Sequence, residues 1–65
     1  MGYIEFESTH IIRVTQEALL LDIGGEEKWV PKSVIDGGIG YHYDDEDMVR
    51  DIDIAEWFAI QEELI

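Results

Sequence analysis

Two adjacent glycines, Gly24 and Gly25, constrain the fold of this chain more than any other feature. They lie between an apolar run, Ala18 to Ile23, and the β-prone segment Glu27 to Val30. Glycine adopts positive φ angles without steric cost, so a Gly-Gly pair between two such runs is typical of a tight turn. The sequence therefore predicts a β-hairpin over these residues.

The segments on either side of the hairpin continue the β pattern. Residues 3–7 alternate apolar and acidic side chains, and residues 9–15 are dense in β-branched residues, so both predict strand structure with a bend near Ser8. Pro31 cannot donate a hydrogen bond to a neighbouring strand and is expected to end the hairpin. Residues 31–35 are expected to form a single helical turn or a corner.

The second half of the chain begins with a segment rich in glycine and acid. Residues 36–47 contain three glycines and five acidic residues, and they predict a long exposed loop. Residues 49–54 alternate again, which predicts a strand with Asp51 and Asp53 pointing together into solvent. The apolar spacing of residues 55–64 predicts a C-terminal helix.

Strands followed by one terminal helix predict an α+β fold. We expect a small, strongly bent antiparallel sheet of four or five strands, partly closed like a barrel, with the helix against one side. A chain of 65 residues is expected to form one acidic domain spanning residues 1–65. The expected core consists of Ile4, Phe6, Ile12, Val14, Leu19, Leu21, Trp29, Val34, Ile52, Ile54, Trp57, Ile60 and Leu64.

The chain carries a large negative charge. Sixteen acidic residues against four basic ones give a formal charge of −12, and residues 36–65 hold ten of the acids with Arg50 as their one base. Such a charge attracts cationic partners and repels nucleic acid and anionic membranes. Because 46% of the residues are apolar, the charge is expected on a folded body and not on a disordered tail.

Other patterns exclude several classes of protein. The chain has no cysteine, no apolar run long enough to span a membrane and no signal-peptide pattern, so we expect a cytoplasmic monomer. Asp45 and Asp47 share the first spacing of an EF-hand calcium loop, but Arg50 stands where that loop needs glycine. Lys32 and Ser33 are adjacent and have no accompanying oxyanion feature. The sequence predicts no enzyme, no metal site and no cofactor.

Two short motifs resemble those of small proteins from phages and mobile elements. These are Lys28 to Ile35 (KWVPKSVI) and Ile54 to Ala59 (IAEWFA), followed by the terminal Leu64-Ile65, and the match runs from about residue 18 to residue 65. In size and charge the chain is also similar to phage anti-defence proteins, including anti-CRISPR proteins that imitate DNA. This resemblance implies a binding protein that acts in the cytosol of a host cell.

The acids therefore suggest imitation of a nucleic acid. Duplex DNA presents one negative charge per roughly 1.7 Å of axis, and a rigid array of carboxylates would occupy the basic groove of a nucleic-acid-binding protein in its place. The residues expected to contact the partner are Asp44, Asp45, Glu46, Asp47, Asp51, Asp53 and Glu56, with Tyr41 and Tyr43 as anchors and Glu62 and Glu63 as secondary contacts. The alternative is a non-catalytic phage accessory or interaction module, whose acidity serves solubility and which binds through an apolar patch such as the edge from Trp29 to Val34.

Overall fold

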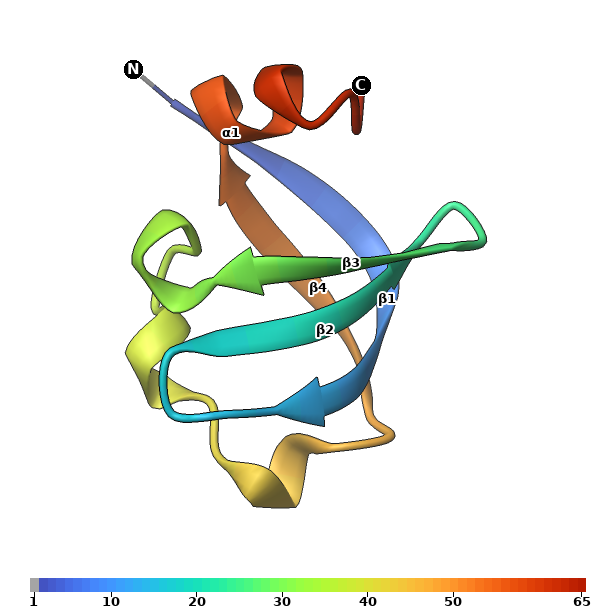
Figure 1. Ribbon diagram of the computed structural model, residues 1–65, viewed down its shortest axis with the longest axis vertical. Coiled ribbons are helices and arrows are strands. Elements are labelled where there is room, and N and C mark those ends of the chain that lie inside the picture. The colour runs from blue at the N-terminus through green and yellow to red at the C-terminus, as the bar shows by residue number, and fades with distance from the viewer. Residues whose placement is uncertain (1) are drawn as a thin grey trace.

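The computed structural model describes residues 2–65, which form a four-stranded antiparallel sheet followed by one α-helix (Figure 1). The strand order is β3-β2-β1-β4. The elements are β1 (Tyr3–Val14), β2 (Ala18–Ile23), β3 (Glu26–Pro31), β4 (Val49–Ala55) and α1 (Glu56–Gln61), with the 3₁₀ helices η1 (Lys32–Val34), η2 (Gly38–Gly40) and η3 (Tyr43–Asp45) between β3 and β4. The antiparallel sheet and the C-terminal helix confirm that part of the predicted fold.

The hairpin predicted from the two glycines is present. Gly24 and Gly25 have φ angles of 61° and 85°, as the tight turns that join twisted antiparallel strands require. The Asp22 side chain accepts a hydrogen bond from the Gly25 N–H at 3.0 Å, which fixes the turn from one side. The helical turn expected after Pro31 is also present, as η1.

The long strand β1 pairs with different neighbours along its length. Its first part lies beside β4, with Tyr3 opposite Ala55, and its last part lies beside β2, with Val14 opposite Leu19. The register with β4 shifts between Phe6 and Thr9, where Ser8 has a φ of 54°. This irregularity is the bend predicted near Ser8, and such bulges increase the local twist of a strand.

A second irregularity in β1 changes which isoleucine enters the core. The register with β2 shifts between Ile11 and Arg13. Ile11 is fully buried, whereas Ile12, which we expected in the core, is only partly buried. The extra residue of the bulge interrupts the simple alternation on which the prediction depended.

The core lies between the sheet, α1 and the 3₁₀ helices. Its buried apolar residues are Ile11, Val14, Leu19, Leu21, Val30, Val34, Ile35, Ile52, Ile54, Ala55, Phe58 and Ala59. The prediction was wrong for Trp29, Trp57 and Ile60, whose exposed fractions are 52%, 48% and 58%. In β3 the inward position belongs to Val30, and on the short helix α1 it is Phe58 and Ala59 that face the core.

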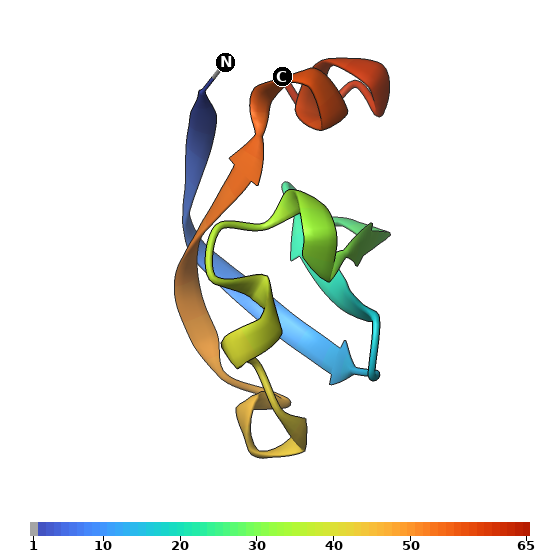
Figure 2. The same ribbon diagram turned by 90° about the vertical axis from the view of Figure 1, so that its left-hand side faces the viewer.

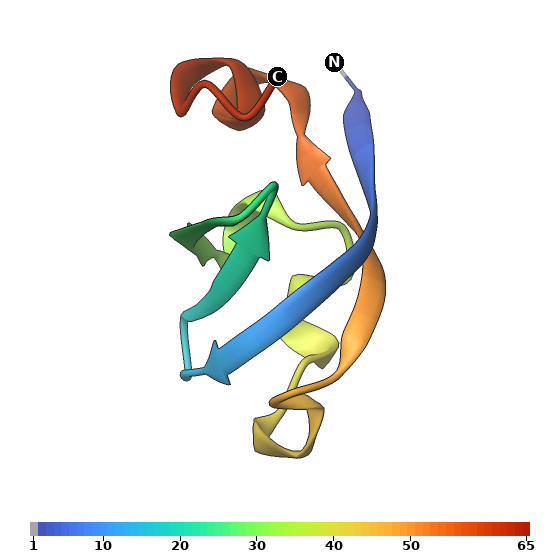
Figure 3. The same cartoon turned by 90° about the vertical axis from the view of Figure 1, so that its right-hand side faces the viewer.

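The sheet is open, with β3 and β4 at its two edges, so the predicted partial closure into a barrel is not confirmed. Residues 36–47 form a long and mostly exposed connection, as expected, but they contain the short 3₁₀ helices η2 and η3 and bury Gly38. Figures 2 and 3 show β4 and the first half of β1 as one wall of the molecule, and β2, β3, α1 and the 3₁₀ helices lie on the inner side of that wall. The outward surface of that wall is therefore open to solvent.

We expect Gly38→Ala to lower the free energy of unfolding by about 1–3 kcal/mol, the usual cost of overpacking. A Cβ atom at residue 38 would lie 2.3 Å from the backbone oxygen of Lys32, so η1 and η2 would have to move apart. Gly40→Ala is the matched control, because a Cβ there meets open space. Urea denaturation measures both variants, and equal stability of the two would contradict the close packing of η1 and η2.

Candidate partner-binding surface

Four carboxylates gather on the outward surface of the β1–β4 pair. They belong to Glu5, Glu7, Asp51 and Asp53, and we call this group the acidic face. Glu5 lies directly opposite Asp53 in the strand register. Because the alternating residues of β4 are buried, Asp51 and Asp53 point away from the core, as predicted. Like charges placed directly opposite each other in a sheet are destabilising.

The charges of the acidic face have no basic partner close by. Three ion pairs occur within residues 2–65, and none of them includes a member of the acidic face. Desolvation, followed by the negative charges of Asp51, Asp53 and Glu7, raises the pKa of Glu5 above its ordinary value. Since the Glu5 side chain is itself exposed, desolvation has little to act on, and we regard the neighbouring carboxylates as the main cause.

Glu5 and Glu7 were absent from the residues that we expected to contact a partner. They lie more than forty positions from Asp51 in the sequence, and only the pairing of β1 with β4 brings the two segments together. The alternation of acidic residues at positions 5 and 7 was visible, but it carried no information about which strand would lie beside them.

Asp51 also supports the backbone of the sheet. Its Oδ1 accepts a hydrogen bond from the Ser8 N–H at 3.0 Å, at the point where β1 bends away from regular pairing. This bond restricts the orientation of the carboxylate, so one member of the acidic face is held in a defined position.

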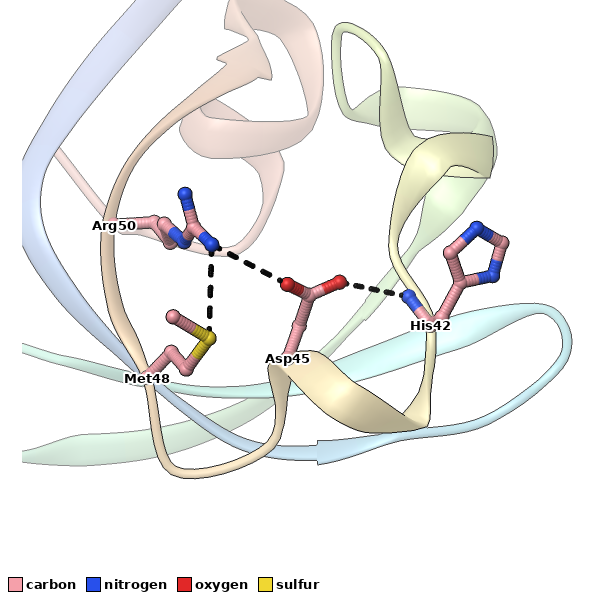
Figure 4. A network of polar contacts seen from close by, with 4 residues as sticks. All are labelled: His42, Asp45, Met48 and Arg50. Carbon is pink, nitrogen blue, oxygen red and sulfur yellow. Dashed lines mark hydrogen bonds and ion pairs between the residues drawn. The ribbon is translucent and has the colours of Figure 1, made fainter.

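Asp45 turns toward β4 instead of projecting into solvent (Figure 4). Its Oδ2 accepts a hydrogen bond from the His42 N–H at 2.9 Å, and its Oδ1 lies 3.5 Å from a guanidinium nitrogen of Arg50. Only 19% of its side chain is exposed. The same guanidinium nitrogen lies 3.6 Å from the sulfur of Met48. Asp45 therefore fastens η3 to β4, and its charge is largely offset.

The neighbours of Asp45 divide between structural and exposed positions. Glu46 accepts a hydrogen bond from the Val14 N–H at 2.9 Å, which ties residues 46 and 14 together. Asp47 lies 3.4 Å from the His10 imidazole but keeps 85% of its side chain exposed. Asp44 is exposed on η3. Of these three acids, Asp44 and Asp47 present charge to solvent.

The two tyrosines of this region differ in exposure. Tyr41 is partly buried against the core, and its backbone oxygen accepts a hydrogen bond from Lys32 Nζ at 3.0 Å. Burial raises the pKa of Tyr41, with Arg50 acting in the opposite direction and Asp45 and Asp53 reinforcing the rise. Tyr43 is 73% exposed and lies at the start of η3, so it is the more accessible of the two expected anchors.

The C-terminal acids lie at the far end of the molecule. Glu56 begins α1 directly after β4, while Glu62 and Glu63 follow the helix, with Glu63 in a left-handed conformation (φ 57°). Figure 1 shows α1 and η3 at opposite ends of the long axis, which extends 29 Å. The structure therefore does not bring Glu62 and Glu63 together with residues 44–47, and the acidic face lies on the strands between the two ends.

A cleft of about 710 Å³ opens between β4 and the segment that precedes it. The residues that line it include Asp36, Asp45 and Asp51, together with Tyr41 and Arg50. Acids outnumber the single base, so the cleft suits a cationic group better than an anionic one. Within residues 2–65, no group of three or more His, Cys, Asp or Glu side chains is arranged to hold a metal ion.

We expect Glu46→Ala to lower the free energy of unfolding by about 1.5–3 kcal/mol, as is usual for a hydrogen bond to a charged group. The variant leaves the Val14 N–H without its acceptor. Asp44→Ala removes the same charge from an exposed neighbouring position and should change stability by less than about 0.5 kcal/mol. Urea denaturation at neutral pH measures the free energy of unfolding of both variants. A decrease of similar size in the two would show that Glu46 has no structural role.

The raised pKa of Glu5 predicts a dependence of stability on pH. The folded state binds the Glu5 proton more tightly than the unfolded state, so this group lowers stability as the pH rises past the ordinary glutamate pKa of about 4.3 and through the raised value. Glu5→Gln should remove that loss and be more stable than the parent protein at neutral pH. Glu17→Gln, at an exposed position away from the acidic face, should not.

Thermal unfolding from acid to neutral pH measures this effect for all three proteins. If Glu5→Gln and Glu17→Gln followed the same profile as the parent, the carboxylates around Glu5 would not repel one another.

Comparison of this chain with protein-family models, with curated proteins and with solved structures gave no match. Within residues 2–65, none of the helices has the length and apolar character needed to cross a membrane.

Proposed function

We propose that this protein is an inhibitor that imitates nucleic acid and blocks the basic nucleic-acid-binding groove of another protein. The acidic face is the main observation that supports this proposal. Its four carboxylates lie on two hydrogen-bonded strands, with no ion pair to any residue from 2 to 65. Unpaired like charges lower the stability of a sheet. Their presence on adjacent strands therefore favours a function that needs several carboxylates close together.

The spacing of the acidic face suits this role. Residues two apart on a strand lie about 7 Å from each other, and neighbouring strands lie about 4.8 Å apart. Duplex DNA carries one charge per roughly 1.7 Å of its axis. Two adjacent strands together carry one carboxylate per about 3.5 Å, which is about half the charge density of the duplex and close to the roughly 3.4 Å spacing along one DNA strand. A folded sheet holds these carboxylates in fixed positions, which reduces the entropy lost on binding.

Further acids lie near the two ends of β4 and flank the acidic face. Asp47 and Asp44 lie near one end of β4, and Glu56 lies at the other end. Asp36 lines the cleft beside β4 together with Asp51, where a lysine or arginine side chain of the partner would find opposite charge. Together these acids spread negative charge along the long axis of the molecule.

The protein would act by occupancy and not by catalysis. A partner with a groove lined by Lys and Arg would bind the inhibitor in place of its nucleic acid, with fast association that weakens as salt screens the charges. The resemblance to small phage proteins makes a CRISPR effector or another host defence nuclease the most concrete partner. The inhibitor would bind as a monomer in the host cytosol, without direct contact with nucleic acid or membrane.

A second candidate function is a phage accessory or interaction module in which the acids only maintain solubility. The exposure of Trp29, Trp57 and Ile60 favours this alternative, because large apolar side chains at a surface often mark contacts with other proteins. In that case binding would depend on these side chains and would change little when acids are reversed.

The test is reversal of charge on the acidic face. We expect the triple variant Glu5→Lys, Glu7→Lys and Asp53→Lys to lose at least about tenfold in affinity, equivalent to about 1.4 kcal/mol, because the attraction becomes repulsion. Asp51 is left in place because it supports Ser8. The control Glu17→Lys, Glu26→Lys and Glu27→Lys makes the same change in net charge at exposed positions outside the acidic face.

Biolayer interferometry and DNA-cleavage assays against guide-loaded Cas9, a guide-loaded Cascade complex and a restriction endonuclease measure the effect at low and high salt. The control variant should retain inhibition, and circular dichroism confirms that both variants fold. Equal inhibition by the two variants would contradict the proposal and favour the interaction module.

A further inference from the structure

The edge of β4 that faces away from β1 is covered over only part of its length. The Asp36 N–H donates a hydrogen bond to the Asp53 carbonyl oxygen at 2.9 Å, so the chain before residue 37 runs beside the end of β4. Gly37 has a φ of 70°, in the left-handed region, and the chain turns into η2 at this point. Within residues 2–65, no segment pairs with the remaining edge from Val49 to Asp51.

The backbone groups on this edge point away from β1. The Ile11 N–H donates a hydrogen bond to the Met48 carbonyl oxygen at 2.8 Å, so Met48 faces β1 and the next residue, Val49, faces the free edge. Asp53 faces the same edge, because its carbonyl oxygen accepts the bond described above. Asp51 lies two residues from each and therefore faces the edge as well. Val49 and Asp51 thus present two N–H and two C=O groups, which have no backbone partner within residues 2–65.

The unpaired edge lies in the cleft of about 710 Å³ between β4 and the segment that precedes it. Residues 49–51 line this cleft from β4, and Asp36, Gly37, Gly40 and Tyr41 line it from the preceding segment. A strand that pairs with an edge lies about 4.8 Å from it, so strand addition requires open space beside the edge. The cleft supplies that space. Sheet edges of this kind recognise extended peptides by adding them as a further strand.

The Arg50 side chain leaves these edge groups unpaired. By the alternation of β4 it lies on the inner side, together with the buried Ile52 and Ile54. Its guanidinium reaches Asp45 there, and this contact joins β4 to η3 (Figure 4). The backbone of Arg50 lies opposite Thr9 and faces β1. The contact between Arg50 and Asp45 therefore connects the two walls of the cleft without bonding to the edge of β4.

The charge of the cleft decides which segment would bind there. Asp36 and Asp51 both line it, and neither forms an ion pair within residues 2–65. The positive charge of Arg50 is offset by Asp45. A segment with lysine or arginine at every second position would present its cations on one side, toward the free carboxylates. A second copy of the chain would be repelled, because each copy carries a net charge of −12.

We infer that the free edge of β4 binds an extended basic segment of the partner by strand addition. This inference rests on the proposed function and adds backbone hydrogen bonds to the attraction between charges. In such complexes the main-chain bonds give affinity, and alternate side chains give specificity. The opposite edge of the sheet, β3, is less suited to this role, because it carries Lys28 and ends at Pro31, and both residue types discourage strand pairing.

Two synthetic peptides in which lysine alternates with valine serve as probes. They share one sequence and one charge, but the second is methylated on its backbone nitrogens and therefore cannot donate hydrogen bonds to β4. Isothermal titration at low salt should show the unmethylated peptide binding at least about tenfold more tightly, which corresponds to about 1.4 kcal/mol. Amide hydrogen exchange of the parent protein should slow at Val49 and Asp51 when this peptide is bound, and should stay unchanged along β3.

The matched variants are Val49→Pro and Val49→Ala. Val49 is the first residue of β4 and is 59% exposed, a position at which proline is tolerated. Val49→Pro removes one N–H from the free edge and leaves every charge in place, so it should abolish the difference between the peptides. Val49→Ala keeps the N–H and should preserve the difference. Circular dichroism checks that both variants fold, and hydrogen exchange of the parent protein decides the question without them.

The outcomes separate this inference from the function on which it rests. Equal binding of the two peptides, a difference that survives in Val49→Pro, or unchanged exchange at Val49 and Asp51 overturns strand addition at β4 and leaves the electrostatic proposal standing. Failure of both peptides to bind overturns both. Sedimentation equilibrium of the protein alone supplies the remaining check: a dimer that Val49→Pro dissociates would make a second copy the occupant and overturn the inference.

Discussion

The pairing of β1 with β4 is the interaction on which the rest of the structure depends. It joins the two ends of the chain, it places Glu5 opposite Asp53, and it forms the wall against which the apolar core packs. The strand β1 is long enough to serve two neighbours, so its second part continues the sheet onto β2 and β3. One strand therefore positions the acidic face and carries the sheet to the opposite side of the core.

This pairing combines favourable and unfavourable contacts. On the inner side, Phe6 lies opposite Ile52, and burial of apolar surface stabilises the pair. On the outer side, the carboxylates oppose each other and lower the stability that the core provides. Asp51 offsets part of this cost through its bond to the Ser8 N–H. A basic partner would relieve the repulsion, so stability lost in the free protein would be recovered as affinity.

Local patterns in the sequence predicted the local structure. Features that depend on contacts between distant segments could not be predicted from such patterns. The Gly-Gly hairpin, the bend at Ser8 and the outward position of Asp53 follow from residues close together in the chain. Ile12 and Trp29 were misplaced because each has an equally apolar neighbour, and the choice between neighbours depends on a bulge or on strand register. Glu5 was missed as a site residue for a related reason, since its partner strand lies at the other end of the sequence.

The most direct test of this account is the titration of individual carboxyl groups by carbon-detected NMR. The account predicts that the Glu5 carboxyl titrates above its ordinary pKa, and that Asp53→Asn lowers that value because an opposing charge has been removed. A Glu5 carboxyl that titrates in its ordinary range, unchanged by Asp53→Asn, would contradict the account. The acidic face would then be a set of independent surface charges.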